Sequence, residues 1–231
     1  SAGEELYAFT QPFFENLDAV SQKIRGGVAQ TIRLAASTTV FRDHLPDILG
    51  TARKDFPSLH PSLRVGIQPE IEKWLLDNEV DLGVTVLSSK PPYELKSEKL
   101  LELQMVLMAP IRLKAKTAED ILGQDRIAQT LISLPQNEGI TRTFQQELAS
   151  RKIDWPLGIE LNSVDLISTY AANGFGIGLS LALPGKKPPK GIRVLPLEDF
   201  PTVPIGALWR GQLSPVGQRI VDLLKEYTAT L

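Results

Sequence analysis

The strongest constraint on this sequence is an alternation of short apolar runs with segments of helical periodicity. In the first half, apolar runs at 31–36, 62–66 and 81–86 are separated by helical segments at 40–54 and 69–78. The run at 81–86 is apolar almost throughout, as expected for a strand that is covered on both faces of its sheet. Strands that alternate with helices of this length predict βαβ units and a mostly parallel sheet.

The second half of the chain repeats this order. Its predicted elements are, along the chain, a strand at 131–134, a helix at 140–152, a strand at 157–161, a helix at 164–172 and strands at 176–181, 192–195 and 204–209. One extended apolar run, 100–109, lies between the two halves. Ser214 and Pro215 are typical of the first positions of a helix and predict the start of a final one. The fold class is therefore α/β.

Composition narrows the chemistry that such a fold can carry. The chain has no cysteine, and its only imidazoles are His44 and His60, so thiol catalysis and cysteine-based metal sites have no residues to use. With 25 Lys and Arg against 27 Asp and Glu, the net charge is −2, which does not favour binding of a nucleic-acid backbone by this chain itself. We expect no metal, no cofactor, no membrane segment and a cytoplasmic protein.

Residues 2–25 show a separate amphipathic pattern. Leu6, Phe9 and Phe13 begin a series of apolar side chains at spacings of three and four residues, which predicts a helix that ends at the two glycines that follow. Because an exposed apolar face favours a partner, we interpret this helix as one that pairs with a second chain or tethers a missing N-terminal domain. Packing of the helix on its own domain is the alternative.

Short neutral polar residues follow four of the predicted strands, at the turns that lead into helices. These turns hold Ser37-Thr38-Thr39, Gln68-Pro69, Gln136-Asn137 and Asn162-Ser163. In open α/β sheets, ligands bind outside the carboxyl ends of strands, where the free N–H groups of helix N-termini attract polar or negative groups. Convergence of the four turns predicts a small-ligand site. The alternative is that each polar residue only caps its helix.

The glycine-rich segment Gly174–Gly178 does not predict a nucleotide site. It follows a predicted helix and leads into a strand, whereas a dinucleotide fingerprint follows a strand and opens a helix. Ser180 lies within the strand and lacks the glycine that a nucleophile elbow needs after the serine. No acid–base pair or activated nucleophile accompanies the polar turns, so the sequence favours binding over catalysis and we expect no enzyme.

A series of short segments also occurs in an order typical of one family. They are Thr31–Ala35 with Ser37–Thr39 after it, Leu45-Pro46 followed by Phe56-Pro57, Val80–Val84, Gly174–Ile177, Leu183-Pro184 and Leu213–Pro215. In this order, over most of the chain, they resemble the C-terminal effector-binding domain of the LysR-type transcriptional regulators. The resemblance implies a fold like that of the type 2 periplasmic binding proteins.

In that fold each of two lobes contains a mostly parallel sheet flanked by helices, and two crossover segments join the lobes. Residues 1–27 would be the end of the linker helix, about 28–109 and 205–231 regulatory lobe I, and about 110–204 regulatory lobe II. The resemblance also implies a homodimer or homotetramer, which contacts DNA only through a winged helix-turn-helix domain that precedes the linker helix. A free solute-binding protein of the same fold is the alternative.

Family effectors bind between the lobes, at turns such as those described above. Carried over by position, the effector-binding residues would be Ser37, Thr38, Thr39, Gln68, Thr85, Gln136, Asn137, Arg142 and Asn162. Arg142 is the one fixed positive charge in this set. The set fits a small carboxylate held by helix N-termini, or a neutral polar molecule.

Overall fold

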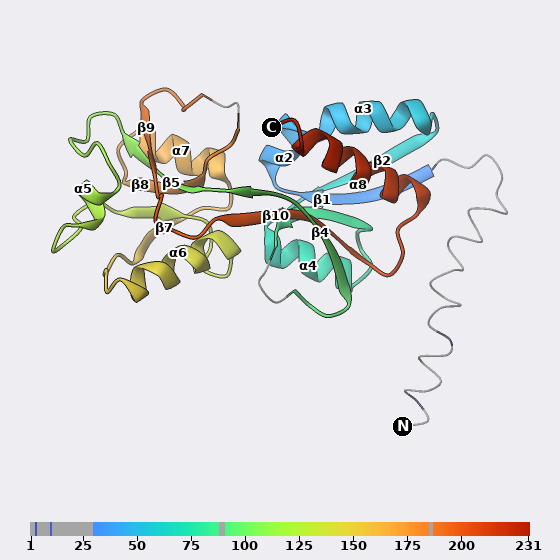
Figure 1. The fold of residues 1–231 in the computed structure, drawn as a ribbon, viewed down its shortest axis with the longest axis horizontal. Coiled ribbons are helices and arrows are strands. Elements are labelled where there is room, and N and C mark those ends of the chain that lie inside the picture. The colour runs from blue at the N-terminus through green and yellow to red at the C-terminus, as the bar shows by residue number, and fades with distance from the viewer. Residues whose placement is uncertain (1–2, 4–9, 11–29, 88–90, 185–186) are drawn as a thin grey trace.

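The computed structural model describes residues 3, 10, 30–87, 91–184 and 187–231. The helix predicted at 2–25 therefore lies outside the described residues, apart from two isolated positions. The described chain forms two lobes side by side, each with its own sheet (Figure 1). Within these ranges, no helix combines the length and the apolar content that a membrane span requires.

Lobe I contains a five-stranded sheet in the order β2-β1-β3-β10-β4. Its elements are β1 (Gln30–Ala36), α2 (Thr38–Asp43), α3 (Leu45–Asp55), β2 (Leu59–Val65), α4 (Gln68–Leu76), β3 (Leu82–Val86), β4 (Leu95–Leu103), β10 (Val203–Arg210) and α8 (Pro215–Thr228). β1 pairs with β2 and β3 in parallel, and β10 is antiparallel to both β3 and β4. Buried residues of α3 and α8 form one core cluster and those of α4 form another, so both faces of the sheet are covered.

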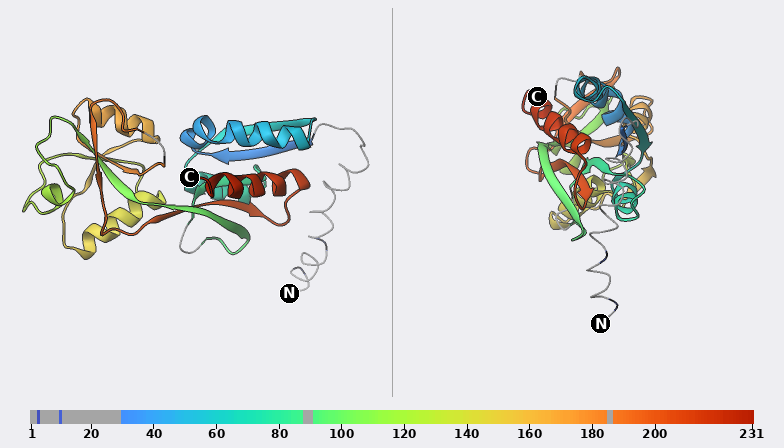
Figure 2. Two further views of the ribbon diagram at one scale, coloured as in Figure 1. Left: turned by 45° about the horizontal axis from the view of Figure 1, so that its top comes forward. Right: turned by 90° about the vertical axis from the view of Figure 1, so that its right-hand side faces the viewer.

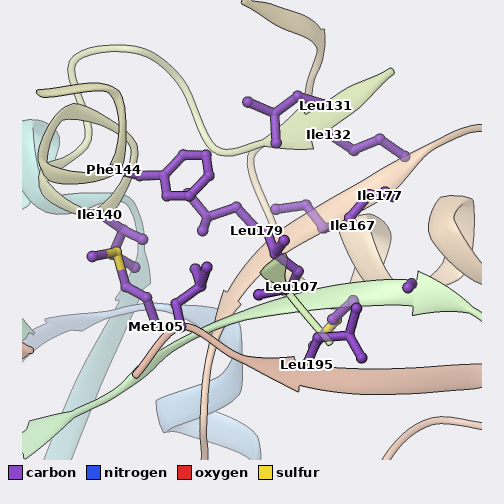
Figure 3. Packing of buried hydrophobic residues seen from close by; sticks show 14 of the residues in the cluster. Met105, Leu107, Leu131, Ile132, Ile140, Phe144, Ile167, Ile177, Leu179 and Leu195 are labelled. Carbon is purple, nitrogen blue, oxygen red and sulfur yellow. The ribbon is translucent and has the colours of Figure 1, made fainter. Parts of the chain in front are cut away.

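Lobe II repeats this plan with the sheet order β7-β6-β8-β5-β9. Its elements are β5 (Met105–Pro110), α5 (Glu119–Leu122), β6 (Leu131–Ser133), α6 (Gly139–Ser150), β7 (Leu157–Glu160), α7 (Val164–Ala172), β8 (Ile177–Leu181) and β9 (Ile192–Pro196). Phe144 of α6 is fully buried and stacks on Phe200 with ring centroids 5.4 Å apart. Aliphatic side chains from the strands and from α7 fill the space around it (Figure 3).

The chain passes between the lobes twice (Figure 2). β5 belongs to the second sheet, so the first crossover lies at Gln104, whereas the sequence placed the boundary at 109/110. The second crossover, 197–202, ends before β10, whereas the sequence placed the boundary at 204/205. The run predicted at 100–109 is thus the end of β4 and most of β5. Uniform apolarity does not reveal where a chain changes from one sheet to another.

The helix predicted at 40–54 is two helices that meet at His44. Pro46 lies in the first turn of α3, where its missing N–H costs nothing, but inside one continuous helix it would remove a hydrogen bond and clash with the preceding turn. The break turns the His44 ring toward α8, where its Nδ1 lies 2.9 Å from the Tyr227 hydroxyl. His44 is therefore a half-buried polar residue with a hydrogen-bond partner.

Candidate ligand-binding cleft

A cavity of about 470 Å³ lies between the two lobes. Lobe I lines it with the turns that follow β1 and β2 and with the end of β3, and lobe II lines it with the turns that follow β6, β7 and β8. Six of the nine predicted effector-binding residues line this cavity: Ser37, Thr38, Thr39, Gln68, Thr85 and Asn162. The structure therefore brings together predicted residues from both lobes.

Gln136, Asn137 and Arg142 lie outside this lining and are exposed. Arg142 donates to the backbone oxygen of Asn137 at 3.2 Å, so these residues form a local cluster at the start of α6. The same turn presents Pro135 and Glu138 to the cavity instead. The cavity lining therefore includes this turn through side chains other than the three predicted from the sequence.

The turn after β1 places hydroxyl groups at the start of α2. The Ser37 side chain accepts a hydrogen bond from the backbone N–H of Val40 at 3.5 Å, which is long for a helix cap. Thr39 is 9% exposed, and it lines both this cavity and a smaller neighbouring one of about 250 Å³. A long cap bond leaves the Ser37 hydroxyl able to bind a ligand, and Thr39 offers a sheltered second hydroxyl.

Gln68 and Glu138 join the lobes on one side of the cavity. Glu138 is the N-cap residue of α6, and its carboxylate accepts a hydrogen bond from the backbone N–H of Gln68 at 2.9 Å. Burial raises the pKa of Glu138 to about 7, although the Gln68 N–H and the charge of Arg142 act in the opposite direction. The sequence analysis did not select Glu138 as a site residue. The sequence feature that could have pointed to it is a charged residue directly before a glycine that begins a helix.

Arg42 and Asp165 join the lobes on the opposite side, between α2 and α7. The guanidinium and the carboxylate are 2.7 Å apart, with side chains 49% and 44% exposed. The hydrogen bonds that Arg42 donates to Asp43 and Asp165 raise the pKa of Arg42, so its charge is permanent. An ion pair this exposed contributes about 0–1 kcal/mol, so it orients the lobes more than it holds them together.

A buried hydroxyl also lies at the cavity, on β8. Among buried side-chain atoms of the described residues, the hydroxyl of Ser180 and the amide oxygen of Gln129 have no hydrogen-bond partner. Ser180 is 1% exposed and belongs to the cavity lining. Leaving a buried polar atom unpaired costs about 1–3 kcal/mol. Sequence reasoning considered Ser180 only as a nucleophile and had no signal for this environment.

The electrostatic character of the cavity is neutral to acidic. Its described lining includes Glu70, Glu138 and His44, and no lysine or arginine. Glu70 accepts from the backbone N–H of Ile67 at 2.9 Å, so two carboxylates of the protein already occupy N–H groups at the start of α4. A helix N-terminus attracts anions, and here glutamate side chains satisfy that attraction. The described residues contain no group of three side chains suited to bind a metal ion.

Comparisons with known proteins agree with this geometry. The HTH-type transcriptional activator CmpR of Synechocystis sp. is 26% identical over 222 residues, which cover 91% of this chain and 70% of that protein. The effector-binding domain of QuiR in complex with shikimate has a TM-score of 0.75 at 14% identity and covers 88% of this chain and 99% of its own.

The CcmR regulatory domain of Synechocystis PCC6803 in complex with 2-PG has a TM-score of 0.72 at 23% identity, covering 87% of this chain and 98% of its own. These structures show the same two-lobe fold. Residues 25–229 match the family described as the LysR substrate binding domain. The chain belongs to the LysR substrate-binding-domain family.

Proposed function

We propose that this chain is the effector-sensing domain of a LysR-type transcriptional regulator. The observation that supports this function best is the cavity between the lobes, which is lined from both sides by the turns after parallel strands. Solved structures of the same fold hold small molecules, namely shikimate, 2-PG and benzoate. A ligand that contacts both lobes binds one arrangement of the lobes more tightly than others, and this difference in affinity is what a sensor requires.

The sensing domain would act on a winged helix-turn-helix domain N-terminal to it, through a linker that ends within residues 1–27. We propose a homodimer or homotetramer in the cytoplasm that contacts DNA only through that domain. A free solute-binding protein is the alternative, and the family match and the transcriptional regulators among the relatives favour the regulator. Catalysis is not proposed, because the described cavity lining offers no nucleophile with an adjacent base.

Two classes of effector fit the sequence, a small carboxylate and a neutral polar molecule, and the cavity favours the neutral one. No described lining residue supplies a fixed positive charge, and Glu70 and Glu138 add carboxyl groups to the lining. Hydroxyl and amide groups of Thr39, Asn162 and Ser180 suit a ligand that both donates and accepts hydrogen bonds. We therefore propose a neutral, hydroxyl- or carbonyl-bearing effector with an apolar body.

A thermal-shift screen tests the function itself. At one hundred times its dissociation constant, an effector is expected to add about 2.7 kcal/mol to the free energy of unfolding, because it binds only the folded protein. Neutral hydroxylated compounds should dominate the hits, with carboxylates of the same size as matched controls. A screen in which the carboxylates bind and their neutral counterparts do not would contradict the proposed effector class.

Two substitutions, one in each lobe, test the position of the site. Thr39→Val and Asn162→Ala are each expected to weaken binding of a confirmed ligand by about 1 kcal/mol, because each removes one hydrogen bond to the ligand. Titration calorimetry measures the loss. Asn137→Ala is the matched control, since Asn137 is exposed and outside the cavity lining. Equal affinity in all three variants would place the ligand outside the cleft.

A further inference from the structure

Gln68, Glu138 and Gly139 make two hydrogen bonds across the lobe boundary in opposite directions. The backbone N–H of Gln68, at the start of α4, donates to the Glu138 carboxylate at 2.9 Å. The backbone N–H of Gly139, at the start of α6, donates to the side-chain oxygen of Gln68 at 3.0 Å. Gln68 and Glu138 are 2% and 3% exposed, so water is excluded from the contact. Each helix start thus receives its hydrogen-bond acceptor from the other lobe.

The close approach of the lobes here depends on a glycine. A Cβ atom added to Gly139 would lie 2.5 Å from the Gln68 side-chain oxygen and 2.9 Å from a methyl group of Val86. Both neighbours belong to lobe I, at the start of α4 and the end of β3. Any larger residue would therefore push lobe II away from lobe I. The small size of glycine at this first position of α6 is what the contact requires.

We propose that Gln68, Glu138 and Gly139 form a latch that holds the ligand cleft closed and that couples its closure to uptake of a proton. The geometry alone provides the closure, since the two hydrogen bonds exist only while the helix starts meet. Closing the latch moves the Glu138 carboxyl group from water into the boundary between the lobes. A carboxylate resists that transfer far more than a neutral carboxylic acid does, so protonation favours the closed state.

The charges around Glu138 support this direction. From α4, Glu70 and Glu72 face it with like charge, and the Gln68 side chain donates to Glu72 at 2.8 Å. From α6, Arg142 is the opposing positive charge, but it is exposed. Burial is the largest cause of the shift. The balance of burial and these charges gives Glu138 a pKa of about 7 in the closed state. In an open state, with Glu138 in water, the pKa returns toward the ordinary 4.5.

A distance measurement between the helices tests the latch directly. The chain contains no cysteine, so a thiol-reactive spin label attaches only to the two cysteines that are introduced. The two substitutions are Lys73→Cys on α4 and Gln146→Cys on α6. Both positions are exposed, and each lies in a different lobe. Pulsed electron–electron double resonance on the ligand-free chain then gives the ratio of the short, closed distance to the longer, open one. The two pKa values predict a ratio about 30-fold higher at pH 5.5 than at pH 8.5.

Three further variants separate the parts of the latch. Glu138→Gln, which is always neutral, is expected to give the same ratio at both pH values. Gly139→Ala is expected to lengthen the distance at both pH values. Gly158→Ala is the matched control, because its Cβ would meet Thr130, at 2.6 Å, inside lobe II and away from the boundary. Its distances should match those of the wild type.

A wild-type distance distribution that is identical at pH 5.5 and 8.5, or a Gly139→Ala distribution identical to wild type, would overturn the proposal. If Gly139→Ala does not fold by circular dichroism, Gln68→Ala replaces it, since it removes the acceptor of the Gly139 N–H without adding bulk. The latch rests on the proposed cleft, but its test uses no ligand. A failed latch therefore leaves effector sensing standing, and a failed ligand screen leaves the latch standing.

Discussion

Replacing Phe144 by alanine is expected to lower the free energy of unfolding by about 3–5 kcal/mol. The ring is fully buried, stacks on Phe200 at 5.4 Å and meets the edge of Trp155 at 6.2 Å. Removing it leaves a cavity that neighbours from three separate segments cannot fill without moving. The loss should appear in urea denaturation as a lower midpoint with an unchanged slope.

Tyr93→Ala is the control for this substitution. Tyr93 is 93% exposed, so removing its ring is expected to change the free energy of unfolding by less than about 0.5 kcal/mol. A Phe144→Ala variant with a loss as small as that of Tyr93→Ala would contradict the packing shown in Figure 3. Because α6 carries both Phe144 and Gly139 of the latch, a loosened helix should also weaken contact between the lobes.

The free energy of unfolding is expected to depend on pH through Glu138. Its pKa in the folded protein is about 7, above the ordinary 4.5, so between these values the folded state binds the proton more tightly than the unfolded state. The stabilisation is complete below pH 4.5 and is lost as the pH rises to 7. At 1.36 kcal/mol per pH unit, the loss is about 3 kcal/mol.

The measurement compares urea denaturation of the wild type and Glu138→Gln across this range. The difference between their free energies of unfolding should change by about 3 kcal/mol from pH 4.5 to pH 7 and stay constant above it. Glu160→Gln, at an exposed position of β7, is the matched control and should show no such change. A Glu138→Gln curve parallel to the wild-type curve would show that Glu138 titrates as an ordinary exposed carboxyl group.

Local signals in the sequence predicted elements well wherever local energetics decide the structure. The helix predicted at 164–172 is found with the same bounds, and Ser214 caps α8 by accepting from the backbone N–H of Gly217 at 3.2 Å. Apolar periodicity and capping are properties of a few adjacent residues. The crossover at Gln104 was missed because the choice between two sheets depends on partners far away in the chain.

In the cleft, too, local features were predictable from the sequence and long-range packing was not. The four polar turns were predicted because a turn that joins a strand to a helix is a local feature, and all four contribute residues to the cavity lining. Which side chains of the turn 135–139 point inward was not predictable, because that depends on how lobe I packs against it. Glu138 points inward, where its carboxylate accepts a hydrogen bond from the backbone N–H of Gln68 at the start of α4, whereas Gln136 and Asn137 are left in solvent.

The order of strands in lobe I has a consequence for biosynthesis. β10 lies between β3 and β4 in the sheet, yet it is made after every strand of lobe II. During synthesis, all strands of the lobe II sheet have therefore been made once residue 196 is added. At that point β10, the strand that joins β4 to the rest of the lobe I sheet, has not yet been made. We expect the lobe in the middle of the chain to fold first, and the lobe that contains both ends of the described core to be completed only as the last thirty or so residues emerge.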